Sequence, residues 1–247
     1  DDVGYMFTNN YQLIVGEPVP IFYDNAEDGM INWNSQSWGI SMLESYNGDQ
    51  SLTDSPDGDY PHISSEYMNL SVPLDLTNAT DAFITYYAKW DIEERYDFAQ
   101  IFASTNGNDW IPLVGEQMTE GSGIGMQNSG EWGYDGVSDW VQDNVSLTEY
   151  AGEPWVWIRF EMNADTYVSG DGIYIDDFTV MVYDNNSLFG DVNLDGNVDV
   201  LDIVEMVNII VYGIELNEDE FPLYDLNYDD EVNVLDVVLL ASTILGN

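Results

Sequence analysis

Two stretches near the C-terminal end place oxygen-bearing side chains at the spacing of a calcium-binding loop. In residues 191–202 these side chains stand at loop positions one, three, five, nine and twelve. Gly196 stands at position six, where the backbone must turn sharply. Calcium is a hard cation that prefers several oxygen ligands, so this spacing predicts a calcium site. Its predicted ligands are Asp191, Asn193, Asp195, Asp199 and Asp202, with Asn197 supplying its backbone carbonyl.

The same pattern recurs in residues 225–236, and position 225 minus position 191 gives a repeat of 34 residues. One such loop in an acidic protein could arise by chance, whereas two in register are a strong signal. Asp230 replaces the turn glycine, and Asp tolerates the left-handed backbone conformation better than most residues. We therefore predict a second, weaker calcium site. Its predicted ligands are Asp225, Asn227, Asp229, Asn233 and Asp236, with Glu231 supplying its carbonyl.

Each loop runs into an apolar segment, residues 200–211 and residues 234–245, and we predict that both segments are helices. Without an ion, the carboxyl and amide groups of one loop would crowd a single turn and repel one another. Calcium binding is therefore expected to be coupled to the folding of these helices.

The duplicated unit of loop and helix resembles a dockerin, a small calcium-binding domain that plugs into a cohesin on another protein. The resemblance covers residues 189–247, and Asn at position three and Asp at position twelve both fit the family. Dockerins usually carry Lys, Arg and small hydroxyl residues on the partner-facing helix, whereas here that helix is apolar and acidic. The resemblance implies a protein partner, either a cohesin-like domain or copies of this chain, without identifying it.

The overall composition limits the classes of function. The chain has 247 residues, with 47 Asp plus Glu against three Lys plus Arg, and a formal net charge of -44. Such a surface repels nucleic acid and anionic membranes, and it should destabilise the folded state unless cations or salt intervene. We therefore expect neither nucleic acid as a partner nor insertion into a membrane. No cysteine is present, and no apolar run reaches the ~20 residues that span a bilayer.

The calcium loops and the acidity also suggest where the protein works. Loops of this kind fill where calcium is abundant, so we expect a secreted or cell-surface protein. The acidic surface suggests a marine or salt-tolerant bacterium. Asp1 looks like the processed start of a longer precursor.

The fold class is predicted to be mainly β, an antiparallel β-sandwich or jelly roll with a small C-terminal α-helical domain of loop–helix repeats. Clusters of Gly, Asn, Asp and Pro separate short strand-like runs, and the Asn106-Gly107 pair predicts a hairpin. The strand-like runs are residues 82–90, 98–104, 155–162 and 173–182.

We predict three parts: residues 1–20, residues 21–184 and residues 185–247. Alternation in residues 11–15 is typical of a strand, which cannot be stable alone. Residues 1–20 could be the end of an upstream domain, an intersubunit strand, or the first strand of the sandwich that follows.

Five short motifs occur in order along the β region, at residues 51–60, 88–93, 96–99, 138–140 and 171–178. Together they resemble the MAM-like jelly roll, of the immune inhibitor A type, that follows the catalytic domains of secreted bacterial peptidases. The resemblance implies a non-catalytic accessory domain with a buried structural calcium. The ligands that it implies are Glu27, Asp54, Asp59 and Asp176.

Aromatic residues add the option of sugar binding. Trp155, Trp157 and Arg159 are expected to share the outer face of one strand. Trp157 could stack on a sugar ring or pack against a partner, and a covering loop or the dockerin-like unit would account for it equally well. Catalysis has little support, because His62 is the sole histidine and no zinc or nucleophile motif accompanies it.

The sequence thus favours a non-catalytic, extracellular calcium-binding module that serves assembly, as the accessory region of a secreted peptidase or other hydrolase. We expect two calcium ions in the dockerin-like loops and one more in the jelly roll. Two alternatives are a self-assembling, calcium-dependent filament or surface-layer subunit, and a module that binds polysaccharide.

Overall fold

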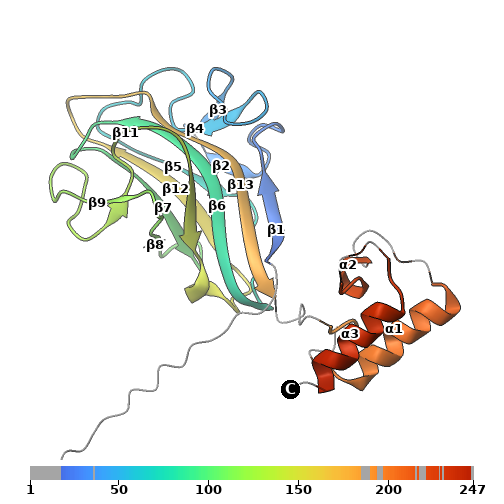
Figure 1. Cartoon of the computed structure of the whole chain (residues 1–247). Coiled ribbons are helices and arrows are strands. Elements are labelled where there is room, and N and C mark those ends of the chain that lie inside the picture. The colour runs from blue at the N-terminus through green and yellow to red at the C-terminus, as the bar shows by residue number, and fades with distance from the viewer. Residues whose placement is uncertain are drawn as a thin grey trace, which may run out of the picture. The chain divides into compact units, whose positions relative to one another are not determined.

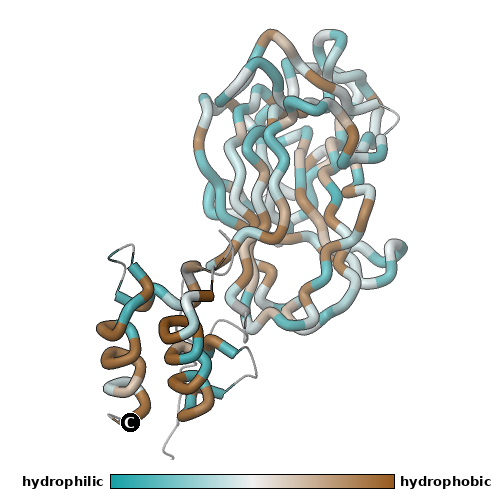
Figure 2. Tube along the Cα trace, turned by 90° about the vertical axis from the view of Figure 1, so that its right-hand side faces the viewer, coloured by the Kyte–Doolittle hydropathy of each residue, from teal (hydrophilic) through white to brown (hydrophobic). Residues whose placement is uncertain are grey.

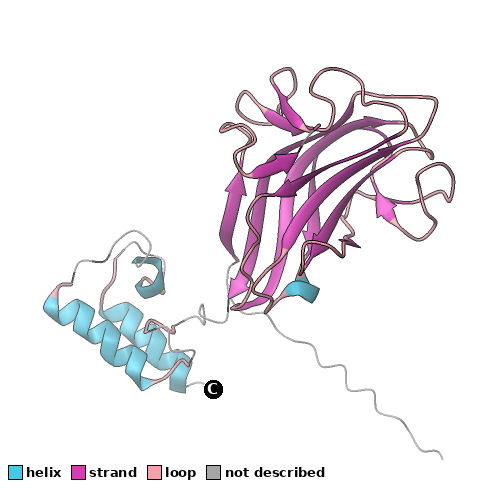
Figure 3. Ribbon diagram, turned by 180° about the vertical axis from the view of Figure 1, so that it is seen from behind, coloured by secondary structure: helices cyan, strands magenta, loops and turns pink. Residues whose placement is uncertain are grey.

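The computed structural model describes residues 18–35, 37–184, 190–193, 197–214, 216, 221–227, 229 and 231–245. The strand predicted at residues 11–15 lies outside these ranges. Contacts divide the chain into two compact units, of which the first is Pro18–Val182 and the second begins at Tyr183 and includes the C-terminal helices. Figure 1 labels most elements of both units, and Figure 3 colours strands and helices differently.

The first unit is a sandwich of antiparallel strands, which confirms the predicted fold class. Its described strands form a sheet in the order β11-β6-β13-β4-β3, with β1 pairing β13, and a second sheet in the order β2-β5-β12-β7-β8. A short pair, β9 and β10, forms a separate two-stranded sheet. The strands are β1 Val19–Asp24, β2 Trp33–Ser35, β3 Gly39–Ser41, β4 Ser51–Thr53, β5 Ser64–Leu70, β6 Ala79–Ile92, β7 Phe98–Ser104, β8 Ile111–Pro112, β9 Thr119–Glu120, β10 Trp132–Gly133, β11 Gly136–Ser146, β12 Trp157–Ala164 and β13 Gly172–Asp184.

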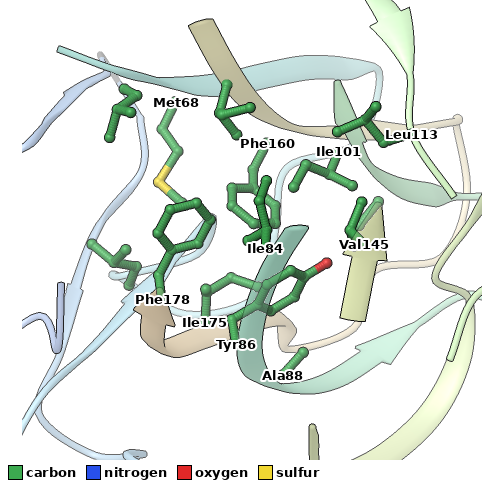
Figure 4. Packing of buried hydrophobic residues seen from close by; sticks show 14 of the residues in the cluster. Met68, Ile84, Tyr86, Ala88, Ile101, Leu113, Val145, Phe160, Ile175 and Phe178 are labelled. Carbon is green, nitrogen blue, oxygen red and sulfur yellow. The ribbon is translucent and has the colours of Figure 1, made fainter. Parts of the chain in front are cut away.

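Alternation of side chains explains why these segments are strands with one face in the core. Along β6, every second residue from Ala82 to Ile92 is buried, while Thr85, Tyr87 and Lys89 between them are partly exposed. Phe160 in β12 is opposite Met68 in β5 and Ile101 in β7, so the centre of the second sheet delivers three apolar side chains to one layer. Figure 4 shows these residues packed against Tyr86, Ile175 and Phe178 of the facing sheet.

The predicted hairpin at the Asn-Gly pair is present. Ala103 in β7 is opposite Ile111 in β8, and Gly107 between them has φ of 71°, in the left-handed region that glycine favours. The hydroxyl of Ser104 accepts the N–H of Gly107 at 2.9 Å, which closes the turn.

The sandwich begins slightly before the predicted boundary, which follows residue 20. β1 begins at Val19, which is opposite Val182 of β13, so residues 19 and 20 belong to the sandwich. Residues 21–23 also lie within β1.

The second unit contains α1 Val200–Tyr212, the short α2 Phe221–Tyr224 and α3 Val234–Leu245. Helices α1 and α3 coincide with the two predicted apolar segments, whereas α2 was not predicted. Figure 2 shows apolar residues recurring along α1 and α3. The unit has a small core of its own, formed by Val192, Met206, Ile209, Tyr224, Leu226 and Leu240.

Candidate calcium loops and the surfaces around them

The carboxylate at position twelve of the first loop lies at the centre of that loop. Asp202 is fully buried, and its Oδ1 accepts the N–H of Asn193 at 3.2 Å while its Oδ2 accepts the N–H of Asp199 at 2.7 Å. Asp191 at position one is buried as well. Two buried carboxylates that begin and end the same loop form a strong oxygen donor set for a hard cation, so the residues present fit calcium.

The second loop repeats this arrangement. Asp236 is fully buried, and its Oδ1 accepts the N–H of Leu226 at 2.9 Å and that of Asn227 at 3.2 Å. Its Oδ2 accepts the N–H of Asn233 at 2.8 Å. Asp225 is buried at position one, where its Oδ1 accepts the N–H of Asp229 at 3.2 Å.

The residue at position nine begins a helix in both repeats. The side chain of Asp199 accepts the N–H of Leu201 at 2.7 Å, and that of Asn233 accepts the N–H of Leu235 at 2.8 Å. Asp199 and Asp202 also form a capping box at the start of α1, in which the side chain of each accepts the backbone N–H of the other. Each loop therefore ends as the first turn of the helix that follows.

The structure thus brings together most of the residues that the sequence assigns to the loops. Asp195 lies outside the described residues, as do the turn residues Gly196 and Asp230. Of the backbone carbonyls predicted as ligands, the described residues include Asn197 and Glu231, and Glu231 donates its N–H to Asp229 at 3.0 Å.

Both helices expose apolar side chains at equivalent positions of the repeat. In α1 they are Val200, Leu201 and Val204, each more than half exposed. In α3 the residues 34 positions later are Val234, Leu235 and Val238, and each of these is also more than half exposed. We call the first trio the α1 face and the second the α3 face. Their exposure shows that the core of the unit does not need them.

In the sandwich, two of the four implied calcium ligands hold one loop. Glu27 accepts the N–H of Asp49 at 2.7 Å and that of Gln50 at 2.9 Å through Oε1. Asp176 is buried in β13, and its Oδ2 accepts the N–H of Tyr46 at 2.8 Å and that of Asn47 at 3.0 Å. Acids near the first strand and in the last strand therefore fix residues 46–50 between them.

The other two implied ligands lie in different surroundings. Asp54 is buried, its Oδ1 accepts the N–H of Ile173 at 2.7 Å, and its Oδ2 has no hydrogen-bond partner among the described residues. Burial raises the pKa of the Asp54 carboxyl to about 7. Asp59 is exposed. The assignment of a calcium ion to all four residues remains a prediction.

Family models match the two units in turn. The model of the immune inhibitor A-like MAM domain matches residues 56–204, which is more than half of the chain. The chain belongs to this family. The model of the Dockerin type I domain matches residues 189–245, overlapping the first match at residues 189–204. Both resemblances stated from the sequence are thereby confirmed.

Both families have well-defined general properties. Dockerin type I domains bind calcium, bind cohesin partners and are extracellular, and dockerin and MAM-like accessory domains are non-catalytic. No curated protein matches the chain. Within the residues that the structure describes, no helix combines the length and apolar character needed to cross a membrane.

Solved structures show weaker similarities to this MAM-family chain. The K3 cleaved adhesin domain of Lys-gingipain from Porphyromonas gingivalis W83 is 16% identical, with 66% of this chain and 99% of that chain covered and a TM-score of 0.45. The CBM22-1 xylan-binding domain from Paenibacillus barcinonensis Xyn10C is 13% identical, with 69% and 98% covered and a TM-score of 0.42. TmCBM61 in complex with beta-1,4-galactotriose is 13% identical, with 64% and 94% covered and a TM-score of 0.40. At these values the similarities do not indicate what this chain binds.

Of the aromatic residues considered for sugar binding, Trp157 is partly covered in the MAM-like unit. A side-chain atom at Gly107 would lie 3.9 Å from the indole of Trp157, so the β7–β8 turn lies close to it. Trp155 precedes β12 and is exposed. Arg159 lies over two rings, with Cζ at 3.9 Å from the centroid of Tyr67 and at 4.1 Å from that of Trp110.

Sequence reasoning missed one carboxylate cluster in the MAM-like unit. In the described part of the chain, Glu93, Asp97 and Asp165 form a group whose ligand atoms all lie within 4.8 Å of one another. Burial, followed by the neighbouring carboxylates, raises the pKa of Glu93. Its Oε2 is shielded from solvent and has no hydrogen-bond partner among the described residues. Asp97 falls in one of the motifs of the MAM resemblance, but spacing in the sequence did not connect it with Asp165.

Proposed function

We propose that this chain is a non-catalytic, extracellular assembly module that docks to a protein partner through α1 and α3. Each loop holds one calcium ion, and the MAM-like unit holds a third through Glu27 and Asp176, with Asp54 and Asp59 as further implied ligands. The most direct setting is the accessory region of a secreted peptidase or other hydrolase.

The observation that carries this proposal is the exposure of the α1 and α3 faces beside buried loop carboxylates. A helix in a small domain usually turns its apolar residues inward, so three exposed apolar side chains at the start of both helices are available to a partner. The Met206 and Leu240 side chains fill the core instead. The α1 and α3 faces therefore suggest a partner whose docking surface is itself apolar, in contrast to the Lys, Arg and hydroxyl residues typical of dockerins.

The hydrogen bonds within the calcium loops also support this proposal, because they link calcium binding to the stability of the helices. Asp202 and Asp236 connect their loops to the first turns of α1 and α3 through backbone N–H groups. A bound cation would offset the repulsion among the loop carboxylates and so stabilise the helices that present the α1 and α3 faces. The strongly acidic composition is consistent with a marine or salt-tolerant source.

The proposal is tested by capture from the secretome of the source organism in calcium buffer. We expect the wild-type chain to capture a cohesin-like domain, identified by mass spectrometry. Val204→Asp combined with Val238→Asp should abolish capture while calcium content and helical circular dichroism stay unchanged. Val137→Asp, at an exposed valine in β11, is the matched control and should leave capture intact. Capture that survives the double substitution would rule out the α1 and α3 faces as the interface.

The alternative of self-assembly has its own test. If copies of the chain are the partner, sedimentation velocity should show higher oligomers with calcium and a monomer with chelator. A monomer under both conditions would remove this alternative and leave docking to a different protein.

A further inference from the structure

A cavity of about 660 Å³ lies at the edge of the second sheet, where β2 pairs with β5. None of the residues considered for sugar binding from the sequence lines it. Asn34 of β2 is opposite Asn69 of β5, and both residues line the cavity. The lining residues are Trp33, Asn34, Ser35, Ser37, Ser65, Glu66, Tyr67 and Asn69.

The lining offers hydrogen-bonding groups that the protein does not use. In the described part of the chain, the side chains of Asn34 and Ser37 have no hydrogen-bond partner, whereas the hydroxyl of Ser35 donates to the carbonyl of Tyr67 at 2.9 Å. An amide and a hydroxyl together provide both donors and acceptors. An apolar ligand would leave these groups unsatisfied, so the cavity suits a ligand rich in hydroxyl groups.

One aromatic ring in the lining is held in a fixed position. The guanidinium of Arg159 lies over the Tyr67 ring, and Nε of Arg159 donates to Oδ1 of Asn69 at 2.8 Å. Tyr67 nevertheless remains 44% exposed. A ring that is already ordered and partly exposed can stack on the apolar face of a sugar with little further loss of side-chain entropy.

The charge of the lining excludes anionic ligands. Glu66 is the sole charged residue among the lining residues, and the nearby Arg159 is paired with Glu161, with 3.5 Å between Nη1 and Oε2. A sulfated or uronate-rich glycan would meet a carboxylate and a strongly acidic surface without a free cation to receive it.

We propose that this cavity is a binding site for a neutral saccharide, in which Tyr67 stacks on a sugar ring and Asn34 and Ser37 bond its hydroxyl groups. The site would give the assembly module a second attachment, to polysaccharide. It does not depend on the α1 and α3 faces, so the two proposals can fail separately.

Affinity electrophoresis of the full chain in calcium buffer tests the site. The gels contain one soluble neutral polysaccharide each (xylan, galactan, galactomannan or mixed-linkage β-glucan), with alginate as the anionic arm. We expect at least one neutral polysaccharide to retard the wild-type chain and alginate not to do so. Tyr67→Ala should weaken the retardation about tenfold, because the stacking partner is lost. Tyr167→Ala, at an exposed tyrosine outside the cavity, is the matched control and should behave as wild type.

A second variant tests whether the effect of Tyr67→Ala comes from lost packing around Arg159 and not from lost stacking on the sugar. Asn34→Ala keeps the Tyr67 ring and should also weaken binding by several-fold, with an unchanged melting temperature. Retardation that is equal in wild type, Tyr67→Ala and Asn34→Ala would overturn the proposal, and so would retardation by alginate alone or by none of the neutral polysaccharides.

Discussion

Asp202 accepts the backbone N–H of Asp199 at 2.7 Å, so the last carboxylate of the first calcium loop also caps the helix that follows. The same relationship joins Asp236 to Asn233 at 2.8 Å in the second loop. Because a carboxylate has two oxygens with several lone pairs, it can keep these bonds and still serve as a ligand. We therefore expect one side chain to set both the stability of each helix and the calcium affinity of its loop.

Removing this carboxylate should unfold the C-terminal unit selectively. We expect Asp202→Ala to lower the stability of the helical unit by about 2 kcal/mol, because a cap is lost and buried N–H groups lose their acceptor. Far-ultraviolet circular dichroism should show reduced helix, and metal analysis should show one calcium fewer per chain. Glu205→Ala, which removes a carboxylate from the same helix outside the loop, is the control. Equal effects of the two substitutions would contradict the role given to Asp202.

Calcium content provides the second prediction. Metal analysis of the purified chain should give at least two calcium ions, and three if the MAM-like unit holds one. A chelator should abolish the helical signal of the second unit while the sandwich keeps its tertiary signal, because the core of the sandwich is a separate apolar cluster. A helical signal that is insensitive to chelator would contradict coupled folding.

The buried Asp54 predicts a pH dependence of the sandwich in calcium-free buffer. Its pKa is raised from 3.8 to about 7 by burial, so between these values the folded state holds a proton that the unfolded state has released. The free energy of unfolding should therefore fall as the pH rises from about 4 to 7. Asp54→Asn mimics the neutral form, so the melting temperature of the variant minus that of the wild type should grow by several degrees across this range.

Two further measurements complete this test. Asp59→Asn, at an exposed position, controls for the loss of one charge. The same Asp54→Asn comparison in saturating calcium asks whether Asp54 is a ligand, in which case the variant should lose calcium and melt earlier than the wild type. A difference in melting temperature between Asp54→Asn and the wild type that does not change with pH would contradict the raised pKa of Asp54.

The cluster of Glu93, Asp97 and Asp165 gives the fourth prediction. Burial and two neighbouring carboxylates raise the pKa of Glu93, so its charged form is unfavourable in the fold. Glu93→Gln should therefore raise the melting temperature slightly at pH 7 in the presence of chelator. Glu94→Gln, at the exposed neighbouring position, is the control. A lower melting temperature for Glu93→Gln would mean that the negative charge at this position is stabilising.

The parts of this structure that were predictable from sequence are those set by local spacing. The position of Asp202 twelve residues into its loop predicts a ligand role and also fixes its place in the first turn of α1. The alternation in β6 and the turn at Gly107 likewise follow from adjacent residues. A short helix such as α2 has no such pattern, because four residues do not define a period.

The parts that could not be predicted depend on the pairing of distant strands. Asn34 lies beside Asn69 because β2 pairs with β5, and Tyr67 meets Arg159 because β5 pairs with β12. Asp97 and Asp165 come together through contacts that span 68 residues. With 47 acidic residues in the chain, spacing alone gives no means of selecting such a group.

The scarcity of basic residues has a consequence for proteolysis. Trypsin cuts after Lys or Arg, and the chain offers only Lys89, Arg95 and Arg159. Lys89 lies within β6 and Arg159 within β12. The hydrogen bonds of the sheets therefore shield the peptide bonds after these two residues from a protease. Arg95 alone is exposed in a turn, with φ of 73°. In surroundings rich in secreted trypsin-like enzymes, the folded chain would present a single bond to attack.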